Sequence, residues 1–245
     1  MYPGIFAATH PDRPAVIQAE TGEVITYAQL HDQALRLSNV LRAAGFVPGD
    51  HIAICMENNP RYLEVIWGCH YAGLVYTACS SRLTKAEITY IINDCAAKGF
   101  ITSKYKADQA QDIVNDIPNV HLRLMIGGTI PGYDSYESTV DSASSDEPAN
   151  MIDGTDMLYS SGTTGMPKGV ARPFPGTPLG TASGLSQLLT VGLYGFSDAM
   201  VYLSPAPLYH AAPLRFNMSV HGIGGTTVVM EHFDAEDYLK YVEKY

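Results

Sequence analysis

The stretch HIAICMENNPRYLEVIWGCHYAGLVYTAC, residues 51–79, contains the pattern that decides the fold. His51 to Met56 is a short apolar run of the length expected for a buried strand. Asn58-Asn59-Pro60 is typical of a helix start, with a capping side chain and a proline at the first helical position. Apolar residues then follow at helical spacing, and Val75 to Cys79 has the composition of a second strand. The stretch therefore predicts a strand–helix–strand unit.

The same order repeats on both sides of this stretch. Apolar residues recur at helical spacing from 26 to 44, and Gly45 follows where a helix C-cap would stand. The residues at 84–87 form a capping box that opens another helical pattern, and strand-like runs follow at 100–102 and 121–126. This repetition with short connections predicts the α/β class, with a parallel, doubly wound sheet in Rossmann-like layers.

The second half of the chain begins with a change of composition. Residues 133–150, YDSYESTVDSASSDEPAN, are polar, acidic and serine-rich, and we expect them to form an exposed connection rather than part of the core. Strand-like runs return at 157–159, 199–203 and 226–230, and a helical pattern starts near Asp234.

Composition narrows the class of protein. The chain has 245 residues, of which 46% are hydrophobic and 16% charged, so it can bury a sizeable core in one large domain or two small ones. The formal net charge of -10 lacks the basic footprint of a nucleic-acid-binding protein. The sequence has no basic-then-apolar leader and no apolar run long enough to span a bilayer, so we expect a cytoplasmic protein without a transmembrane segment.

Several conspicuous side chains are expected to be structural. Four cysteines lack the C-x-x-C spacing of a zinc or redox site, and we expect them to be reduced, mostly buried thiols. They are Cys55, Cys69, Cys79 and Cys95. Tyr62, Trp67 and Tyr71 lie on one helical pattern and are expected in the core rather than in a site.

The segment YSSGTTGMPKGV, residues 159–170, carries the clearest chemistry. It combines four hydroxyl side chains, three glycines and one cation, Lys168. Glycines let backbone amides turn toward a bound anion, and hydroxyls donate hydrogen bonds to phosphate oxygens. The lysine adds a point charge. We interpret the segment as a polyphosphate-binding loop rather than a flexible, solvated surface loop. Its Pro-Lys-Gly context disfavours a Walker-type NTPase, which requires Gly-Lys-Ser/Thr.

This loop resembles the phosphate-loop signature of the adenylate-forming superfamily, which includes acyl-CoA synthetases, adenylation domains of nonribosomal peptide synthesis and luciferases. Three further segments are similar to this superfamily in the expected order, so the resemblance covers nearly the whole chain. They are ITYAQLHDQALRLSNVLRAAGFVPGDHIAICMENNP, GLVYTACSSRLTKAEITYIINDCAAKGFIT and LSPAPLYHAAPL. The resemblance favours the CoA-ligase branch and implies its amino-terminal domain fold.

The resemblance also implies roles for individual residues. Lys168 and His210 would serve the reaction, His210 from a position beside the nucleotide and the acyl group. No metal ligand is assigned within the chain. The residues that would contact the ATP phosphates are Ser160, Ser161, Gly162, Thr163, Thr164, Gly165 and Lys168.

The chain departs from the family pattern just after the loop. The family often has a histidine where this chain has Arg172-Pro173-Phe174-Pro175. Arg172 either adds positive charge to the site or is an exposed arginine without a ligand role. His221-Gly222 is a weaker candidate for an acyl pocket, and a packed structural histidine is the favoured interpretation of His221.

The family's Tyr-Gly-x-Thr-Glu-like segment, its ribose-binding aspartate and its carboxy-terminal catalytic lysine do not occur before Tyr245. We therefore interpret the chain as a truncated amino-terminal adenylation domain that does not catalyse adenylation alone. The expected subdomains are a first αβα unit at 45–180, with the phosphate loop, and part of a second built from 1–44 and 185–245.

The resemblance implies an acid–thiol ligase that uses ATP, Mg²⁺ and coenzyme A. A carboxylate would attack the α-phosphate of ATP, and the thiolate of coenzyme A would then displace AMP. The first expectation for the acid is a fatty acid, with short-chain and aromatic acids still open. Two alternatives remain: an adenylating enzyme that loads a carrier protein, and a non-catalytic nucleotide-binding module.

Overall fold

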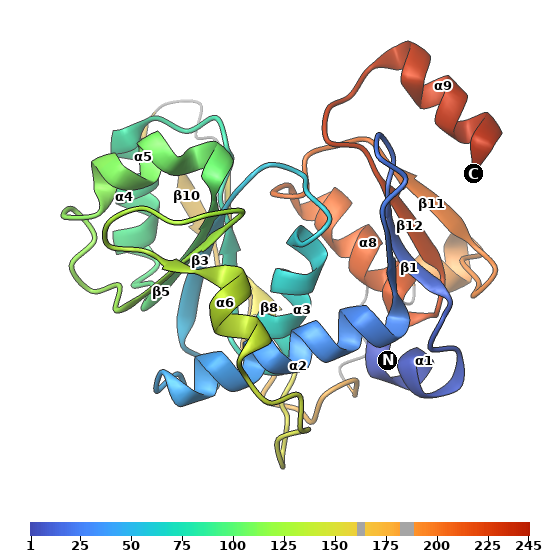
Figure 1. Cartoon of the computed structure of the whole chain (residues 1–245), viewed down its shortest axis with the longest axis horizontal. Coiled ribbons are helices and arrows are strands. Elements are labelled where there is room, and N and C mark those ends of the chain that lie inside the picture. Colours follow the sequence, from blue (N-terminus) through green and yellow to red (C-terminus); the bar gives the residue numbers. More distant parts are fainter. Residues whose placement is uncertain (161–164, 182–188) are drawn as a thin grey trace.

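A computed structural model of the chain describes residues 1–160, 165–181 and 189–245 (Figure 1). Its larger sheet has six parallel strands in the order β7-β6-β5-β3-β4-β8. These strands are β3 (His51–Cys55), β4 (Val75–Ala78), β5 (Gly99–Ser103), β6 (Leu122–Ile126), β7 (Asp134–Ser135) and β8 (Thr155–Asp156). The expected α/β class with a parallel sheet is confirmed.

Helices cover both faces of this sheet, as a doubly wound fold requires. Side chains alternate along β3, so Ile52 and Ile54 join one apolar cluster while Ala53 and Cys55 join another. Figure 1 shows α4 and α5 on one side of β3 and β5, and α2, α3 and α6 on the other. The helices are α2 (Tyr27–Ala43), α3 (Tyr62–Tyr71), α4 (Lys85–Asp94), α5 (Ala107–Ile113) and α6 (Tyr136–Asp141), with a 3₁₀ turn η1 (Lys104–Lys106) before α5.

A smaller sheet joins the two ends of the chain. Its order is β11-β12-β1-β2, with β1 parallel to β12 and antiparallel to β2. Its strands are β1 (Pro14–Gln18), β2 (Val24–Thr26), β11 (Val201–Ser204) and β12 (Thr226–Val229). The helices near it are α1 (Pro3–Thr9), α8 (Ala211–Gly222) and α9 (Ala235–Lys244), and a π-helical turn η2 (Leu189–Leu193) precedes β11.

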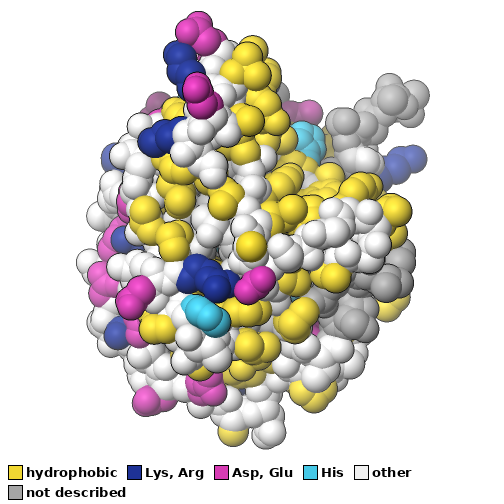
Figure 2. Space-filling model, turned by 90° about the vertical axis from the view of Figure 1, so that its right-hand side faces the viewer, with side chains coloured by type: hydrophobic (Ala, Val, Ile, Leu, Met, Phe, Trp, Pro, Cys, Tyr) yellow, Lys and Arg dark blue, Asp and Glu magenta, His cyan; other side chains and the backbone are white. Residues whose placement is uncertain are grey.

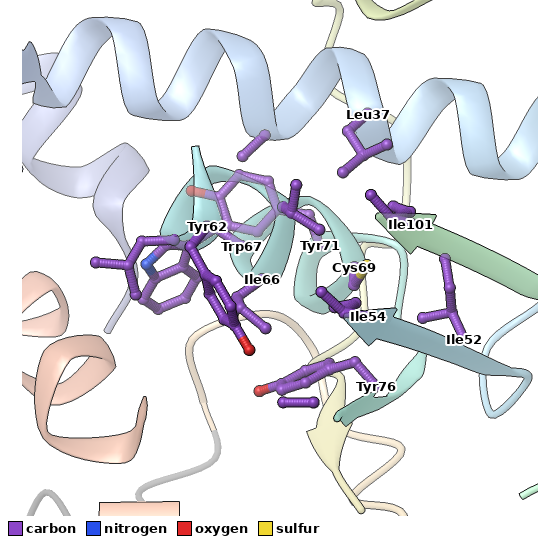
Figure 3. Close-up of a cluster of buried hydrophobic side chains, with 14 of the residues drawn as sticks. Leu37, Ile52, Ile54, Tyr62, Ile66, Trp67, Cys69, Tyr71, Tyr76 and Ile101 are labelled. Carbon is purple, nitrogen blue, oxygen red and sulfur yellow. The ribbon is translucent and has the colours of Figure 1, made fainter. Parts of the chain in front are cut away.

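The expected division into units at 45–180 and at 1–44 with 185–245 stays a prediction. The two sheets follow these ranges, but α2, from the range 1–44, packs on α3 of the first unit. Figure 3 shows Leu37 of α2 beside α3, above Ile54 of β3. Gly68 of α3 allows this close approach, because an added Cβ would lie 2.5 Å from Leu37 Cδ2 and 2.8 Å from its Cβ.

Local capping agrees with the sequence at two helices. Thr84 and Glu87 form the predicted capping box of α4, with Glu87 N 3.3 Å from Thr84 Oγ1 and Thr84 N 2.8 Å from Glu87 Oε2. Thr26 and Gln29 form a second box at the start of α2. Gly45 has φ 87° just after α2, as expected for a residue that ends a helix.

The predicted start of α3 is wrong. The helix begins at Tyr62, two residues after Pro60, because Asn59 Oδ1 first accepts a hydrogen bond from the amide of Arg61 at 3.0 Å. The preceding Asn58 turns its side chain away from the helix toward the smaller sheet.

The expectation that 133–150 is an exposed connection is also wrong for its first part. Tyr133, Tyr136 and Val140 are buried, and Tyr136 Oη donates to Glu64 Oε1 of α3 at 2.7 Å. Three apolar side chains within a polar segment suffice to dock β7 and α6 on the sheet. The expectation is correct for 142–150, which contains no buried residue.

The residues expected in the core are there. Tyr62, Trp67 and Tyr71 are buried, and all four cysteines, which lie within the described residues, are buried free thiols. None of the helices in the described ranges is both long and apolar enough to cross a membrane.

The helix α9 covers part of the outer face of the smaller sheet. Tyr238, Tyr241 and Tyr245 pack against the cluster of Ala19, Val228 and Met230. On the other side of the helix, Leu239 and Val242 remain exposed. Figure 2 looks onto this part of the molecule and shows hydrophobic side chains gathered over its upper half.

His221 of α8 is the buried structural histidine that the sequence favoured. Its Nδ1 accepts a hydrogen bond from Trp67 Nε1 at 3.0 Å, so the ring proton resides on Nε2, 3.1 Å from the carbonyl of Ala15. Thr227 Oγ1 lies 3.0 Å from the same nitrogen. Burial lowers the pKa of His221 from 6.5 to about 4.

This lowered pKa predicts an acid-sensitive component of stability. Between pH 6.5 and 4, His221 is protonated in the unfolded chain but stays neutral in the folded chain. The free energy of unfolding should therefore fall as pH falls through that window. Over the whole window, the free energy of unfolding should fall by about 3 kcal/mol. Urea unfolding at a series of pH values measures it. His221→Gln, which does not titrate, should lack this component, and an unchanged pH slope in the variant would contradict the assignment.

Candidate functional site

The predicted phosphate loop is the turn of a two-stranded hairpin. Strands β9 (Leu158–Ser160) and β10 (Lys168–Val170) are antiparallel, with Ser160 opposite Lys168. Ser160 Oγ donates to the carbonyl of Lys168 at 3.5 Å, so the two ends of the loop are held together. Four predicted phosphate ligands lie outside the described residues, and their roles stay predictions. They are Ser161, Gly162, Thr163 and Thr164.

The stem of the hairpin is fixed from both sides. Tyr159 Oη donates to Asp94 Oδ2, at the end of α4, at 2.5 Å. Partial burial and this hydrogen bond raise the pKa of Tyr159. The ring of Tyr159 lies across Gly169, where an added Cβ would be 2.9 Å from Tyr159 Cζ and 2.5 Å from Met157 Cε. Glycine at 169 is therefore required by packing at the stem.

A cavity of about 430 Å³, which we call the loop cavity, opens between the hairpin and the segment before α8. Ser160 and Gly165 line it from the hairpin, and Tyr209 and His210 line it from the other side. Its floor comes from Ala78, Cys79 and Ser80, at the carboxyl end of β4. The structure thus brings together Ser160, Gly165 and His210, at the strand ends where parallel sheets bind ligands.

Lys168 is not among the residues that line this cavity. It lies on β10, where all three residues are exposed. The site contact predicted for Lys168 therefore stays a prediction.

His210 occupies the N-cap position of α8, and its ring lies 4.4 Å from the ring of Tyr209. Because His210 lines the loop cavity, the amino end of α8 lies beside that cavity. The unpaired amides and the positive end of the helix dipole favour an anion there. The acidic side chain on the opposite wall is Glu87, whose pKa is lowered by its capping bonds to Thr84. An anion bound in the loop cavity would therefore be held by neutral hydrogen-bond donors rather than by net positive charge.

The segment that carries His210 is anchored by Asn58, a residue for which the sequence predicted a different role. Asn58 Nδ2 donates to the carbonyls of Ala206 at 3.1 Å and Met230 at 3.0 Å. Its Oδ1 accepts from the amide of Leu208 at 2.8 Å. Asn58 is 5% exposed and follows β3, while its partners follow β11 and β12. We call this set of three hydrogen bonds the Asn58 clamp.

The structure also assigns a contact to Arg172. Its Nη1 lies 3.5 Å from Asp156 Oδ1 of β8, and Arg215 of α8 pairs with the same carboxylate. These residues line a second cavity and not the loop cavity. Gly222 lines that second cavity, whereas His221 is fully buried. The sequence offered no signal for the pairing, because Asp156 and Arg215 are far apart along the chain.

Within ranges 1–160, 165–181 and 189–245, no group of three or more His, Cys, Asp or Glu side chains is arranged to hold a metal ion.

Comparison with known proteins gives a consistent result. Residues 5–245 match the profile of the AMP-binding enzyme family. The long-chain-fatty-acid–CoA ligase FadD13 of Mycobacterium tuberculosis is 31% identical over 94% of this chain and 44% of its own length. A feruloyl-CoA synthase of Amycolatopsis is 31% identical over 91% of this chain and 42% of its own length. The chain thus spans less than half the length of these relatives.

Solved structures agree on the fold. The crystal structure of the N-terminal domain of FACL13 from Mycobacterium tuberculosis, solved with an inhibitor bound, superposes with a TM-score of 0.83 and 26% identity. The match covers 99% of this chain and 59% of that one. The expected amino-terminal domain fold is therefore confirmed.

The Asn58 clamp predicts a sharp difference between two neighbouring asparagines. Asn58→Asp keeps the acceptor for Leu208 but replaces two N–H donors with oxygen facing two buried carbonyls. We expect it to destabilise the fold by at least about 2 kcal/mol in urea unfolding. Asn59→Asp keeps the acceptor that Arg61 uses and loses one donated bond, from Nδ2 to Glu57 Oε1, so it is the neighbouring control and should cost less than the loss of two donors in the clamp. Equal stability of the two variants would show that the clamp contributes nothing.

Proposed function

We propose, because this chain belongs to the AMP-binding enzyme family, that the protein acts as an ATP-dependent acid–thiol ligase. It would activate a carboxylic acid as an acyl-adenylate and pass the acyl group to coenzyme A. The family membership and the CoA ligases among the relatives support this reaction class. The proposal concerns the whole protein, since the relatives are more than twice as long as the matched chain.

The loop cavity is the single observation that carries the proposal. Ser160 and Gly165 of the hairpin and the amino end of α8, marked by His210, face the same space. Amides, hydroxyls and a helix amino terminus are the neutral donors that bind phosphate groups. The acid would reach the α-phosphate from the side of His210, which agrees with the position that the resemblance implies.

The chemistry explains why such donors are needed. An anionic carboxylate must approach an anionic triphosphate, so the barrier is largely electrostatic and fixed donors lower it. Each charge-assisted hydrogen bond contributes roughly 1.5–3 kcal/mol. Mg²⁺ would supply further neutralisation of the phosphate charge.

The acceptor and the location are narrower proposals. Coenzyme A is the acceptor that the relatives' names support. A carrier protein is the alternative, and thioester formation assayed with each acceptor separates them. Buried, reduced cysteines and the use of ATP support a cytoplasmic location.

The activity is tested by carboxylate-dependent exchange of labelled pyrophosphate into ATP, with the full-length protein and a panel of fatty, short-chain, aromatic and dicarboxylic acids. Exchange that depends on one class of acid is the expected result. A folded protein that shows no exchange with any acid, with Mg²⁺ present, would support the non-catalytic nucleotide-binding module instead.

Lys168 gives a second prediction. Lys168→Ala should slow the exchange about tenfold to a hundredfold, because one charge-assisted contact to a phosphate is lost. Stability should change by less than about 0.5 kcal/mol, since the side chain is exposed. Lys168→Arg, which keeps the charge, is the control and should retain more activity. An unchanged exchange rate in Lys168→Ala would remove Lys168 from the site.

A further inference from the structure

A second cavity, of about 390 Å³, lies between α8 and the larger sheet, and we call it the arginine cavity. Its apolar wall includes Trp67, Tyr76 and Met218. Two glycines, Gly154 and Gly222, leave room along its other sides. An added Cβ at Gly154 would lie 2.6 Å from the carbonyl oxygen of Leu74, so a side chain cannot stand at 154 without moving backbone. The space is therefore shaped to take an apolar group of moderate size.

The arginine cavity and the loop cavity are lined by neighbouring segments of the chain, although they share no lining residue. Asp156 of the arginine cavity precedes Ser160 of the loop cavity by four residues, and Arg215 follows His210 by five. Four strand residues span about 13 Å. Five helical residues span about 7.5 Å. A small acid whose carboxylate reached the loop cavity could therefore extend its far end into the arginine cavity.

One wall of the arginine cavity has a surplus of positive charge. Asp156 accepts two hydrogen bonds from Arg215, from Nη2 at 2.6 Å and from Nε at 3.2 Å. The Arg172 guanidinium contacts the same carboxylate at 3.5 Å. Two guanidinium groups thus share one carboxylate, in a chain whose formal net charge is -10. This local excess is the opposite of what the overall composition favours.

The two arginines differ in what they do for the fold. The bidentate Arg215–Asp156 pair joins α8 to β8, so a structural role accounts for Arg215. Arg172 follows the hairpin in a segment without regular structure, and its side chain is 45% exposed. One long contact does not use the five N–H donors of a guanidinium. Arg172 is therefore the residue that can offer charge and hydrogen bonds to a ligand.

We propose that the arginine cavity receives the far end of the acid substrate, and that Arg172 selects acids carrying a second anionic group, such as dicarboxylates. The identity of the ligand as the activated acid rests on the proposed function. A plain fatty acid, which the resemblance favoured first, offers no anion to Arg172. The selectivity would arise because a guanidinium that is partly removed from water forms a charge-assisted hydrogen bond with a carboxylate but none with the methyl end of a fatty acid.

The cavity contains its own reporter. Trp67 is the single tryptophan of residues 1–245 and lines the arginine cavity. The tryptophan fluorescence change that Trp67→Phe removes therefore reports occupancy of this cavity. The probes are suberate and octanoate, which share a chain length and differ by the second carboxylate. Each is titrated into the protein with and without ATP. We expect suberate to bind about tenfold or more tightly than octanoate, the factor given by one charge-assisted hydrogen bond.

Arg172→Gln should abolish this preference, while Arg172→Lys should retain part of it. Arg36→Gln is the matched control: Arg36 pairs with Asp32 on the surface of α2, away from both cavities, and its loss should leave the preference intact. Because Arg215 still pairs with Asp156 through two hydrogen bonds in these variants, they should keep a melting temperature close to that of the wild type. Equal binding of the two acids, or a preference that survives Arg172→Gln, would overturn the proposal.

Three further outcomes separate this proposal from the proposed function. If coenzyme A, rather than suberate, changed Trp67 fluorescence in an Arg172-dependent manner, the surplus charge would serve the coenzyme phosphates and the proposal would be wrong. If Arg172-dependent suberate binding occurred without any pyrophosphate exchange, the cavity would bind diacids while the ligase function would fail. Exchange with octanoate, together with no response to suberate, would retain the ligase function and exclude the diacid selectivity.

Discussion

The side chain of Asn58 makes the contact on which the candidate site depends, because it joins the ends of two different sheets. It stands just past β3, and it bonds to backbone groups just past β11 and β12. All three strands therefore end at one level, and the loops that follow them face a common space. A side-chain amide in water can exchange its partners for water molecules. The Asn58 side chain is only 5% exposed, so its donors and acceptor must be satisfied by these three hydrogen bonds within the protein. The position of His210 follows from this constraint.

Close backbone approach is the second condition for the site. At Gly68 the helix α3 meets α2, and at Gly154 the chain passes against the backbone of Leu74 and His70. The first contact fixes α3 between α2 and the sheet, as Figure 3 shows for Leu37 and Ile54. The second brings β8 alongside β4, which carries Asp156 toward α8. The arginine cavity is therefore bounded by two elements, α3 and β8, whose positions depend on glycines.

The two cavities solve the electrostatic problem of an acidic chain in different ways. The loop cavity relies on amides, hydroxyls and the end of α8, with Glu87 as an acidic neighbour. The arginine cavity concentrates two guanidinium groups around Asp156. Neutral donors suit a triphosphate that arrives with its own cation, whereas a lone carboxylate at the far end of an acid requires a protein cation. This division would suit the proposed substrate, an acid bound at both ends.

The sequence by itself determined the α/β class, most of the strands and helices between residues 26 and 126, the capping box at Thr84 and the glycine-rich loop. These features depend on near neighbours in the chain, so periodicity and residue type suffice to predict them. Only the tertiary structure decided that Asn58 clamps two sheets instead of capping α3, that Tyr136 docks 133–141 on the core, and that Arg172 and Arg215 share Asp156. These contacts join residues far apart in sequence, and the energy of a buried polar group depends on the partners that folding brings to it.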